Sequence, residues 1–269
     1  HRFGVEQKDK ILKNNLSCDL LYLSATPLPR TLQMSLSKIR NLSLISTPPV
    51  FKKPTITNIY IFDKNLVVNI IKGEMLRGGQ VYVVDSSVNN VVFLHSFISS
   101  KLPFYRSAFI HSKISSKQQK KTMSLFRERK IKILVSTSII ESGLDIGSVN
   151  TIIVNNSHCF GLSQLYQLRG RVGRSSFQSF AHFLVPKKPP QSNRYVSRLK
   201  SIKKNQKLGS GYSVAFDDLN IRGAGSLFGY KQSGGAGVGF EFYTKLVSDV
   251  FIGKSFSSLS SDLILSLGP

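Results

Sequence analysis

The stretch that decides the fold is "QVYVVDSSVNNVVFLHSFISSKL", residues 80–102. Its first six residues, "QVYVVD", contain a short apolar run rich in β-branched side chains at 81–84, which is typical of a strand buried in a parallel sheet. The run from residue 88 onwards has the length and apolar spacing of a helix. We therefore predict a strand over 80–85 and a helix over 88–102.

The same alternation continues in both directions along the chain. Strands are predicted over 19–26, 55–62, 106–111, 132–137, 150–155 and 180–185, and helices over 65–77, 115–129 and 162–171. Alternating strands and helices with short connections predict the α/β class, with a parallel sheet covered by helices on both faces. Such sheets bind ligands at the carboxyl ends of their strands. We expect residues 137–145 and the arginines of 169–174 at that edge.

Composition favours a polyanionic partner. The chain has 37 lysine and arginine residues against 14 acidic ones, a net charge of +23, and such an excess attracts nucleic acids and other polyphosphates. Lysine-rich codon usage is the alternative explanation. The two cysteines and the lack of a CxxC pair give no disulfide framework and no structural metal site.

The sequence has no signal peptide and no uninterrupted apolar run of about 18 residues. We expect a soluble, intracellular protein with no membrane partner. Because residue 1 is histidine rather than methionine, we expect a piece of a longer or processed chain.

The segment "QLYQLRGRVGR", residues 164–174, gathers Arg169, Arg171 and Arg174 with no acid among them. Guanidinium groups bind phosphate oxygens through two parallel hydrogen bonds and stay charged when partly desolvated. The segment therefore predicts a polyphosphate site, with a plain solvated basic surface as the alternative. Arg171 and Arg174 are three residues apart and would point in one direction from a helix, with Arg169 on another side.

A second candidate segment is "STSIIESGLDIG", residues 136–147, where a strand runs into a turn. Gly143 would allow a sharp turn or the close approach of a ligand. The carboxylate of Asp145, two residues later, would accept hydrogen bonds from ribose hydroxyls. The alternative is an ordinary turn with solvated acids.

These segments resemble the motifs of a known superfamily. "QLRGRVGR" resembles motif VI of superfamily 2 helicases and translocases, "STSIIESGLDI" resembles motif V, and "SATPLPRTL" (24–32) resembles motif III. The first residues, "HRFGVEQK", are similar to those that follow a DEEH-type Walker B box. Within the superfamily, "LGSGYSVAFDDLNIRGAGSLFGYKQSG" (208–234) resembles the bacterial transcription-repair coupling factors more than the branch-migration helicases.

The resemblance implies a RecA-like fold and a division of the chain into three parts. Residues 1–50 would end a first RecA-like lobe, and 51–190 would form the second lobe. Residues 191–269 would form a helical-hairpin translocation module and the start of a C-terminal extension.

The resemblance also implies the site residues. Nucleotide contacts would come from Gly143, Asp145, Gln167, Arg171 and Arg174, with Arg171 or Arg174 as the catalytic arginine finger. DNA contacts and coupling would come from Thr26, Arg30, Thr137, Arg222 and Gln232. No metal ligand is expected in this chain.

The implied function is ATP-dependent translocation on double-stranded DNA in the bacterial cytoplasm, using ATP and Mg²⁺. The family displaces stalled RNA polymerase at DNA lesions and couples to nucleotide excision repair, through domains outside this chain. The alternatives are a branch-migration helicase and an inactive basic nucleic-acid-binding relic. Because the sequence contains no GxxxxGK[ST] P-loop, this fragment alone is not expected to hydrolyse ATP.

Overall fold

The computed structural model describes residue 23 and residues 43–45, 47–48, 52–138, 146–188 and 193–222 of the 269-residue chain. The chain divides into two compact units, and nearly all of the described residues belong to the unit Ser43–Arg222. The strand predicted over 19–26 and most of the expected first lobe lie outside the described residues.

The described part alternates strands and helices as the hydrophobic pattern predicts. Its elements are β1 (Ile56–Ile61), α3 (Lys64–Leu76), β2 (Gln80–Val84), α4 (Val88–Lys101), β3 (Ser107–Ile110), α5 (Ser116–Arg127), β4 (Ile133–Ser136), β5 (Val149–Val154), the short 3₁₀ helix η2 (Ser157–Cys159), α6 (Leu162–Arg169), β6 (Phe180–Val185), α7 (Asn193–Lys204) and α8 (Gly211–Arg222). Residues 80–102, with the predicted strand and helix, contain β2 and α4.

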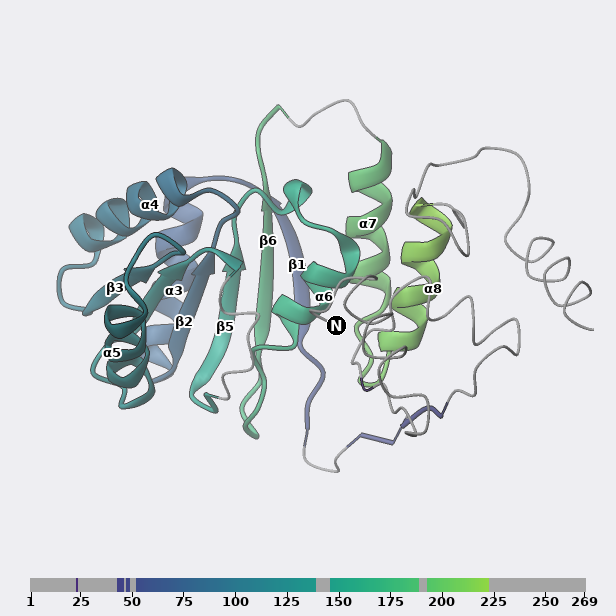
Figure 1. The fold of residues 1–269 in the computed structure, drawn as a ribbon, viewed down its shortest axis with the longest axis horizontal. Helices are drawn as coiled ribbons and strands as arrows, with labels where there is room; N and C mark the ends of the chain where they lie inside the picture. The colour runs from purple at the N-terminus through teal and green to yellow at the C-terminus, as the bar shows by residue number, and fades with distance from the viewer. Residues whose placement is uncertain are drawn as a thin grey trace, which may run out of the picture. The chain divides into compact units, whose positions relative to one another are not determined.

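The strands form one six-stranded sheet in the order β1-β6-β5-β2-β4-β3 (Figure 1). Every neighbouring pair is parallel. All residues of the central strands β2, β4 and β5 are buried, as expected of strands covered on both faces. The α/β class with a parallel, RecA-like sheet is confirmed.

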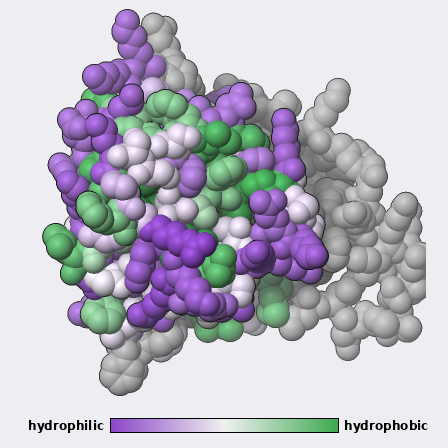
Figure 2. Space-filling view, turned by 90° about the vertical axis from the view of Figure 1, so that its left-hand side faces the viewer, coloured by the Kyte–Doolittle hydropathy of each residue, from purple (hydrophilic) through white to green (hydrophobic). Residues whose placement is uncertain are grey.

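Helices pack on the two faces of the sheet through separate apolar cores. On one face, Ile71 of α3 and Leu94 of α4 pack against β2 and its neighbours. On the other face, Phe126 of α5 and Leu165 of α6 pack against Tyr82 and the residues around it. Full burial of each such side chain stabilises the fold by roughly 1.5–3 kcal/mol. Hydrophilic side chains cover much of the side of the molecule formed by β3, α4 and α5 (Figure 2).

Local signals explain where α3 begins and ends. The Oδ1 atom of Asp63 accepts a hydrogen bond from the amide of Leu66 at 2.9 Å and caps the first turn. Gly78 has a φ of +73°. The amides of Gly78 and Gly79 donate to the carbonyls of Met75 and Glu74 at 3.0 and 3.2 Å, which closes the helix in a Schellman motif. The predicted helix end at the glycine pair is confirmed.

The helices α7 and α8 form a hairpin that packs on α6 (Figure 1). Val214 of α8 belongs to the same apolar core as Leu165 of α6. Inside the hairpin, the Nδ2 atom of Asn205 donates to Asp217 Oδ2 at 2.9 Å. The glycine-dense stretch therefore begins as a helix, and the residues beyond Arg222 lie outside the described part.

His182 on β6 makes the fold sensitive to mild acid. Its ring stacks between those of Tyr60 and Phe180, with centroids 5.9 and 6.1 Å away. Burial lowers the pKa of His182 from 6.5 to about 4. Above pH 6.5 the ring is largely neutral in both the folded and the unfolded chain, whereas between pH 6.5 and about 4 mainly the unfolded chain gains a proton, so stability falls as the pH falls through this range.

We therefore expect wild type to lose about 2 kcal/mol of unfolding free energy between pH 7 and pH 5 that His182→Phe does not lose. Urea titrations of both chains at the two pH values measure the difference. Equal losses in the two chains would show that His182 titrates in the folded state as it does in the unfolded state.

Candidate functional site

Arg171 and Arg174 follow helix α6 rather than lying on it. The helix ends at Arg169, and the amides of Gly170 and Arg171 close its last turn on the carbonyls of Tyr166 and Leu168, both at 3.0 Å. Gly173 then has a φ of +76°, which a helix does not contain. The expectation that the two arginines point from one helix is wrong, because the glycines end the helix before them. We call residues 170–175 the arginine turn.

The arginine turn lies at the amino ends of the strands. Ser175 Oγ is 3.1 Å from Asn150 Oδ1, at the start of β5. A Cβ atom on Gly173 would lie 2.4 Å from Ser179 Oγ and 3.2 Å from Thr55 Oγ1, which precede β6 and β1. The expectation that the arginines lie at the carboxyl edge is wrong, because α6 runs antiparallel to the strands and returns the chain to their amino ends.

The guanidinium groups of Arg171 and Arg174 both influence the pKa of Tyr82 electrostatically. Burial raises the pKa of Tyr82 to about 12, and the positive charges of Arg174 and Arg171 oppose that rise. Arg174 is exposed, and Arg171 and Gln167 are half-buried. The turn therefore carries two cations three residues apart in sequence, one of them open to solvent, and such cations can bind a polyphosphate ligand.

Arg169 has a different environment from the other two arginines. It is buried, and its guanidinium donates to the carbonyls of Ile202 and Asn205 at 2.9 and 2.7 Å. Its guanidinium also lies over the Tyr166 ring, 4.8 Å from the centroid. Burial lowers the pKa of Arg169, although an arginine stays protonated in proteins. Arg169 therefore fastens α6 to the end of α7.

Arg77 holds the segment between the arginine turn and β6. It donates to Glu74 Oε2 at 3.0 Å and to the carbonyl of Gln178, and lies over the Phe180 ring at 5.0 Å. Glu74 is buried and accepts a second bond from Thr151 Oγ1 at 2.7 Å. Sequence reading missed this anchor. Its only local signal was an acid and an arginine three residues apart at a helix end.

The remaining expected site residues lie elsewhere or cannot be placed. Thr137 is buried just after β4, and its amide donates to the carbonyl of Ile110 at 3.3 Å. It is thus at the carboxyl ends of the strands, opposite the arginine turn. Arg222 is the last residue of α8. The expected residues Thr26, Arg30, Gly143, Asp145 and Gln232 lie outside the described residues.

A buried carboxylate organises the carboxyl ends of β2 and β5. Asp85 Oδ1 accepts from the amide of Ser87 and from Asn90 Nδ2, at 2.8 and 3.1 Å. Its Oδ2 atom accepts from Nδ2 of Asn155 and Asn156, at 2.7 and 3.0 Å. Sequence reading did not anticipate this cluster, whose members are up to 71 residues apart.

In the described ranges, no group of three or more histidine, cysteine, aspartate or glutamate residues could hold a metal ion. The same ranges contain no helix long and apolar enough to cross a membrane.

Comparison with known proteins gives first the class of protein. Residues 63–176 match the family described as helicase conserved C-terminal domain. This part of the chain is therefore similar to the C-terminal domain of helicases.

The particular similarity is to transcription-repair-coupling factors. The chain is 42% identical over 92% of its length to the transcription-repair-coupling factor of Myxococcus xanthus, covering 21% of that protein. It is 43% identical over 91% of its length to the chloroplastic ATP-dependent DNA helicase At3g02060 of Arabidopsis thaliana, covering 30% of it. Among solved structures, RecG bound to a three-way DNA junction matches with a TM-score of 0.63 and 28% identity, over 84% of this chain and 30% of that one.

The resemblance to transcription-repair coupling factors seen in the sequence motifs is confirmed. The chain spans between 21% and 30% of the length of these curated relatives.

Proposed function

We propose that this chain is the second motor lobe of an ATP-dependent double-stranded DNA translocase of the transcription-repair coupling type. The observation that carries the proposal is the arginine turn, which follows α6, is bonded to the start of β5 and carries the exposed Arg174 and the half-buried Arg171. The similarity to a transcription-repair-coupling factor over 92% of the chain supports the same proposed function.

On the nucleotide side, Arg174 is the finger and Arg171 its partner. Arg174 is exposed on an anchored turn, so it reaches a phosphate without unfolding its surroundings. A positioned arginine stabilises the charge that develops during phosphoryl transfer. Gly143, Asp145 and Gln167 complete the contacts to ATP, whose β- and γ-phosphates and Mg²⁺ are held by residues outside this sequence.

On the DNA side, Thr26, Arg30, Thr137, Arg222 and Gln232 contact the duplex or couple it to the nucleotide. Arg169 adjoins the arginine turn and is bonded to α7, which packs against α8 and so leads to Arg222. A shift of the turn on contact with phosphate would therefore move α6 and the hairpin together.

The proposed domain division keeps the boundaries 1–50, 51–190 and 191–269. Although the hairpin helices are assigned to the last part, they pack tightly on the lobe, since Ser43–Arg222 form one compact unit. The hairpin is therefore proposed to move with the second lobe.

For the whole protein, we propose displacement of stalled RNA polymerase at lesions and coupling to nucleotide excision repair in the bacterial cytoplasm. RNA polymerase and the repair proteins bind to domains outside this chain. The similarity to a chloroplastic helicase makes a plastid the alternative compartment. A branch-migration helicase is the second candidate function, favoured by the likeness to RecG on a branched DNA.

Two assays on the whole protein test the proposal. With ATP, it should displace the third strand from a DNA triplex and release RNA polymerase stalled on a duplex. Unwinding of branched DNA without polymerase release would favour the branch-migration helicase. Absence of duplex-stimulated ATP hydrolysis would favour the inactive relic.

Arg77 is expected to position the arginine turn. Arg77→Lys keeps a cation near Glu74 but cannot bridge Glu74 and the Gln178 carbonyl. Because misplacement by about 1 Å costs up to about 100-fold in rate, we expect Arg77→Lys to lower the ATP turnover number by about 10–100-fold without weakening DNA binding.

Lys72→Ala is the matched control, since Lys72 is an exposed cation on the same helix. Steady-state ATPase kinetics and the melting temperature of each variant separate positioning from unfolding. Wild-type turnover in a folded Arg77→Lys protein would show that the anchor does not position the turn.

A further inference from the structure

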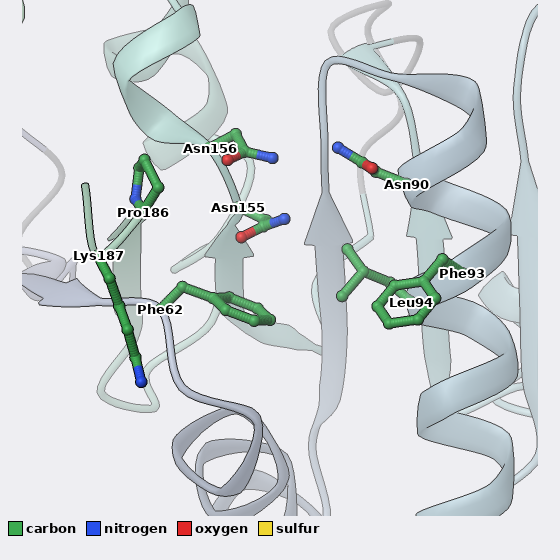
Figure 3. Close-up of a pocket in the computed structure, with 8 residues that line it drawn as sticks. All are labelled: Phe62, Asn90, Phe93, Leu94, Asn155, Asn156, Pro186 and Lys187. Atoms are coloured by element: carbon green, nitrogen blue, oxygen red, sulfur yellow. The ribbon is translucent and has the colours of Figure 1, made fainter. Parts of the chain in front are cut away.

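A pocket lies at the carboxyl ends of β2 and β5. These two strands are neighbours, but β2 continues into α4 on one face and β5 continues into η2 and α6 on the other. Connections that leave in opposite directions open a crevice between the strand ends, where parallel sheets bind ligands. A cavity of about 300 Å³ lies there (Figure 3). That volume is at the lower end of the range of small-molecule sites.

The polar wall of this pocket consists of hydrogen-bond acceptors. The side-chain amides of Asn90, Asn155 and Asn156 all donate through Nδ2 to the buried carboxylate of Asp85. An ionised carboxylate only accepts, so it fixes these amides with their nitrogens towards Asp85 and leaves their oxygens for other partners.

Asn155 shows the consequence most clearly. Its side chain is only 8% exposed, and Figure 3 shows its oxygen pointing towards the ring of Phe62, inside the pocket. Among the residues that the structure describes, none donates a hydrogen bond to that oxygen. This oxygen is not among the fully buried polar atoms that lack a partner, so it is open to the pocket, and a ligand N–H group is its complementary occupant.

The apolar walls are aromatic and the rim is cationic. Phe62 and Phe93 lie on opposite sides of the cavity (Figure 3). Phe93 is 53% exposed, so its ring is accessible to a ligand. Lys187 lies on the rim, and the Nζ atom of Lys64 lies 5.5 Å from the centre of the Phe93 ring. A ligand that fits has a flat ring, N–H donors on its edge and an attached anion.

We propose that this pocket binds an unpaired nucleobase with an exocyclic amine, such as adenine or cytosine, with its phosphate near Lys187 and Lys64. The exocyclic amine donates to the amide oxygen of Asn155, and the ring stacks on Phe93. Thymine offers only its ring N3–H, which is flanked by two carbonyl oxygens that an acceptor-lined wall disfavours, so thymine is discriminated against. This site goes beyond the proposed function, because it uses neither the arginine turn nor Thr137 and recognises an unpaired base rather than a duplex.

The proposal is tested on the whole protein without ATP or Mg²⁺. Fluorescence anisotropy compares the affinities for twelve-residue oligomers of deoxyadenylate and thymidylate. Wild type should bind the adenine oligomer more tightly. Phe93→Ala should weaken binding of the adenine oligomer by about tenfold, which is near the lower end of the affinity loss expected when one base–aromatic stack is removed. It should leave binding of the thymine oligomer unchanged.

Val92→Ala is the matched control, because Val92 is a neighbouring exposed apolar residue on α4 that does not line the pocket. Equal wild-type affinities for the two oligomers, or equal effects of Phe93→Ala and Val92→Ala, would overturn the proposal.

Photo-crosslinking identifies the site and the source of the base. An 8-azidoadenine oligomer and 8-azido-AMP are each crosslinked, and the modified peptides are mapped. Adducts from the oligomer within residues 88–94 or 155–157 indicate a base in a strand, and adducts there from 8-azido-AMP indicate a free mononucleotide. Adducts found only elsewhere with both probes would overturn the proposal.

The outcome is independent of the proposed motor function. Arg174→Ala should keep the adenine preference even when ATP hydrolysis is lost. Loss of that preference in Arg174→Ala would show that the two sites are not separate.

Discussion

Arg174→Ala should lower the duplex-stimulated ATP turnover of the whole protein by about 10³–10⁵-fold, the range measured for arginine fingers. The reason is the geometry of the arginine turn, which holds an exposed guanidinium beside the half-buried Arg171. A finger acts on charge that appears only in the transition state. The turnover number should therefore fall while the KM for ATP changes little.

The matched control is Arg127→Ala, which removes an exposed arginine from α5. It should keep wild-type turnover, because a general loss of positive charge does not remove the finger. Arg171→Ala should also reduce turnover but by less, and a larger loss in Arg171→Ala than in Arg174→Ala would make Arg171 the finger. Turnover unchanged in both Arg171→Ala and Arg174→Ala would contradict the nucleotide-facing role of the turn.

Arg169→Ala should destabilise the lobe by about 3–5 kcal/mol, since a hydrogen bond to a charged group contributes about 1.5–3 kcal/mol. The substitution leaves the carbonyls of Ile202 and Asn205 without this donor and opens a cavity beside Tyr166. The hairpin should detach from α6 before the sheet unfolds, because these bonds join only α6 and the end of α7.

Hydrogen exchange measures this effect by region. The amides of α7 and α8 should lose more protection than those of β2. Urea unfolding measures the total loss of unfolding free energy. Lys203→Ala, which changes an exposed residue of α7, should leave both the exchange protection and the unfolding free energy unaltered. Unchanged protection of α7 in Arg169→Ala would show that the Arg169 hydrogen bonds do not hold the hairpin on α6.

Local patterns predicted most of the described fold. The apolar run of 81–84 became most of β2 because a strand buried on both faces is largely apolar on both sides. The pair Gly78-Gly79 predicted the end of α3 because only a residue that tolerates positive φ closes a helix in this way. Each of these signals lies within a few residues of the structure it determines.

The position of the arginines was predicted wrongly because it depends on more than local sequence. Whether a residue after a helix lies at one edge of a sheet or the other depends on the direction in which that helix crosses the sheet. Here α6 crosses antiparallel to the strands, and the bond between Ser175 and Asn150 places the turn at their amino ends.

The sequence by itself determined the strands, the helices, the parallel sheet and the motifs that carry the family resemblance, since these depend on periodicity and on neighbouring residues. Only the tertiary structure decided how the site is built. Arg77 reaches a carbonyl 101 residues away, and Asp85 gathers amides from up to 71 residues away. Such contacts form only when strands distant in sequence become neighbours in the sheet, and no local pattern records them.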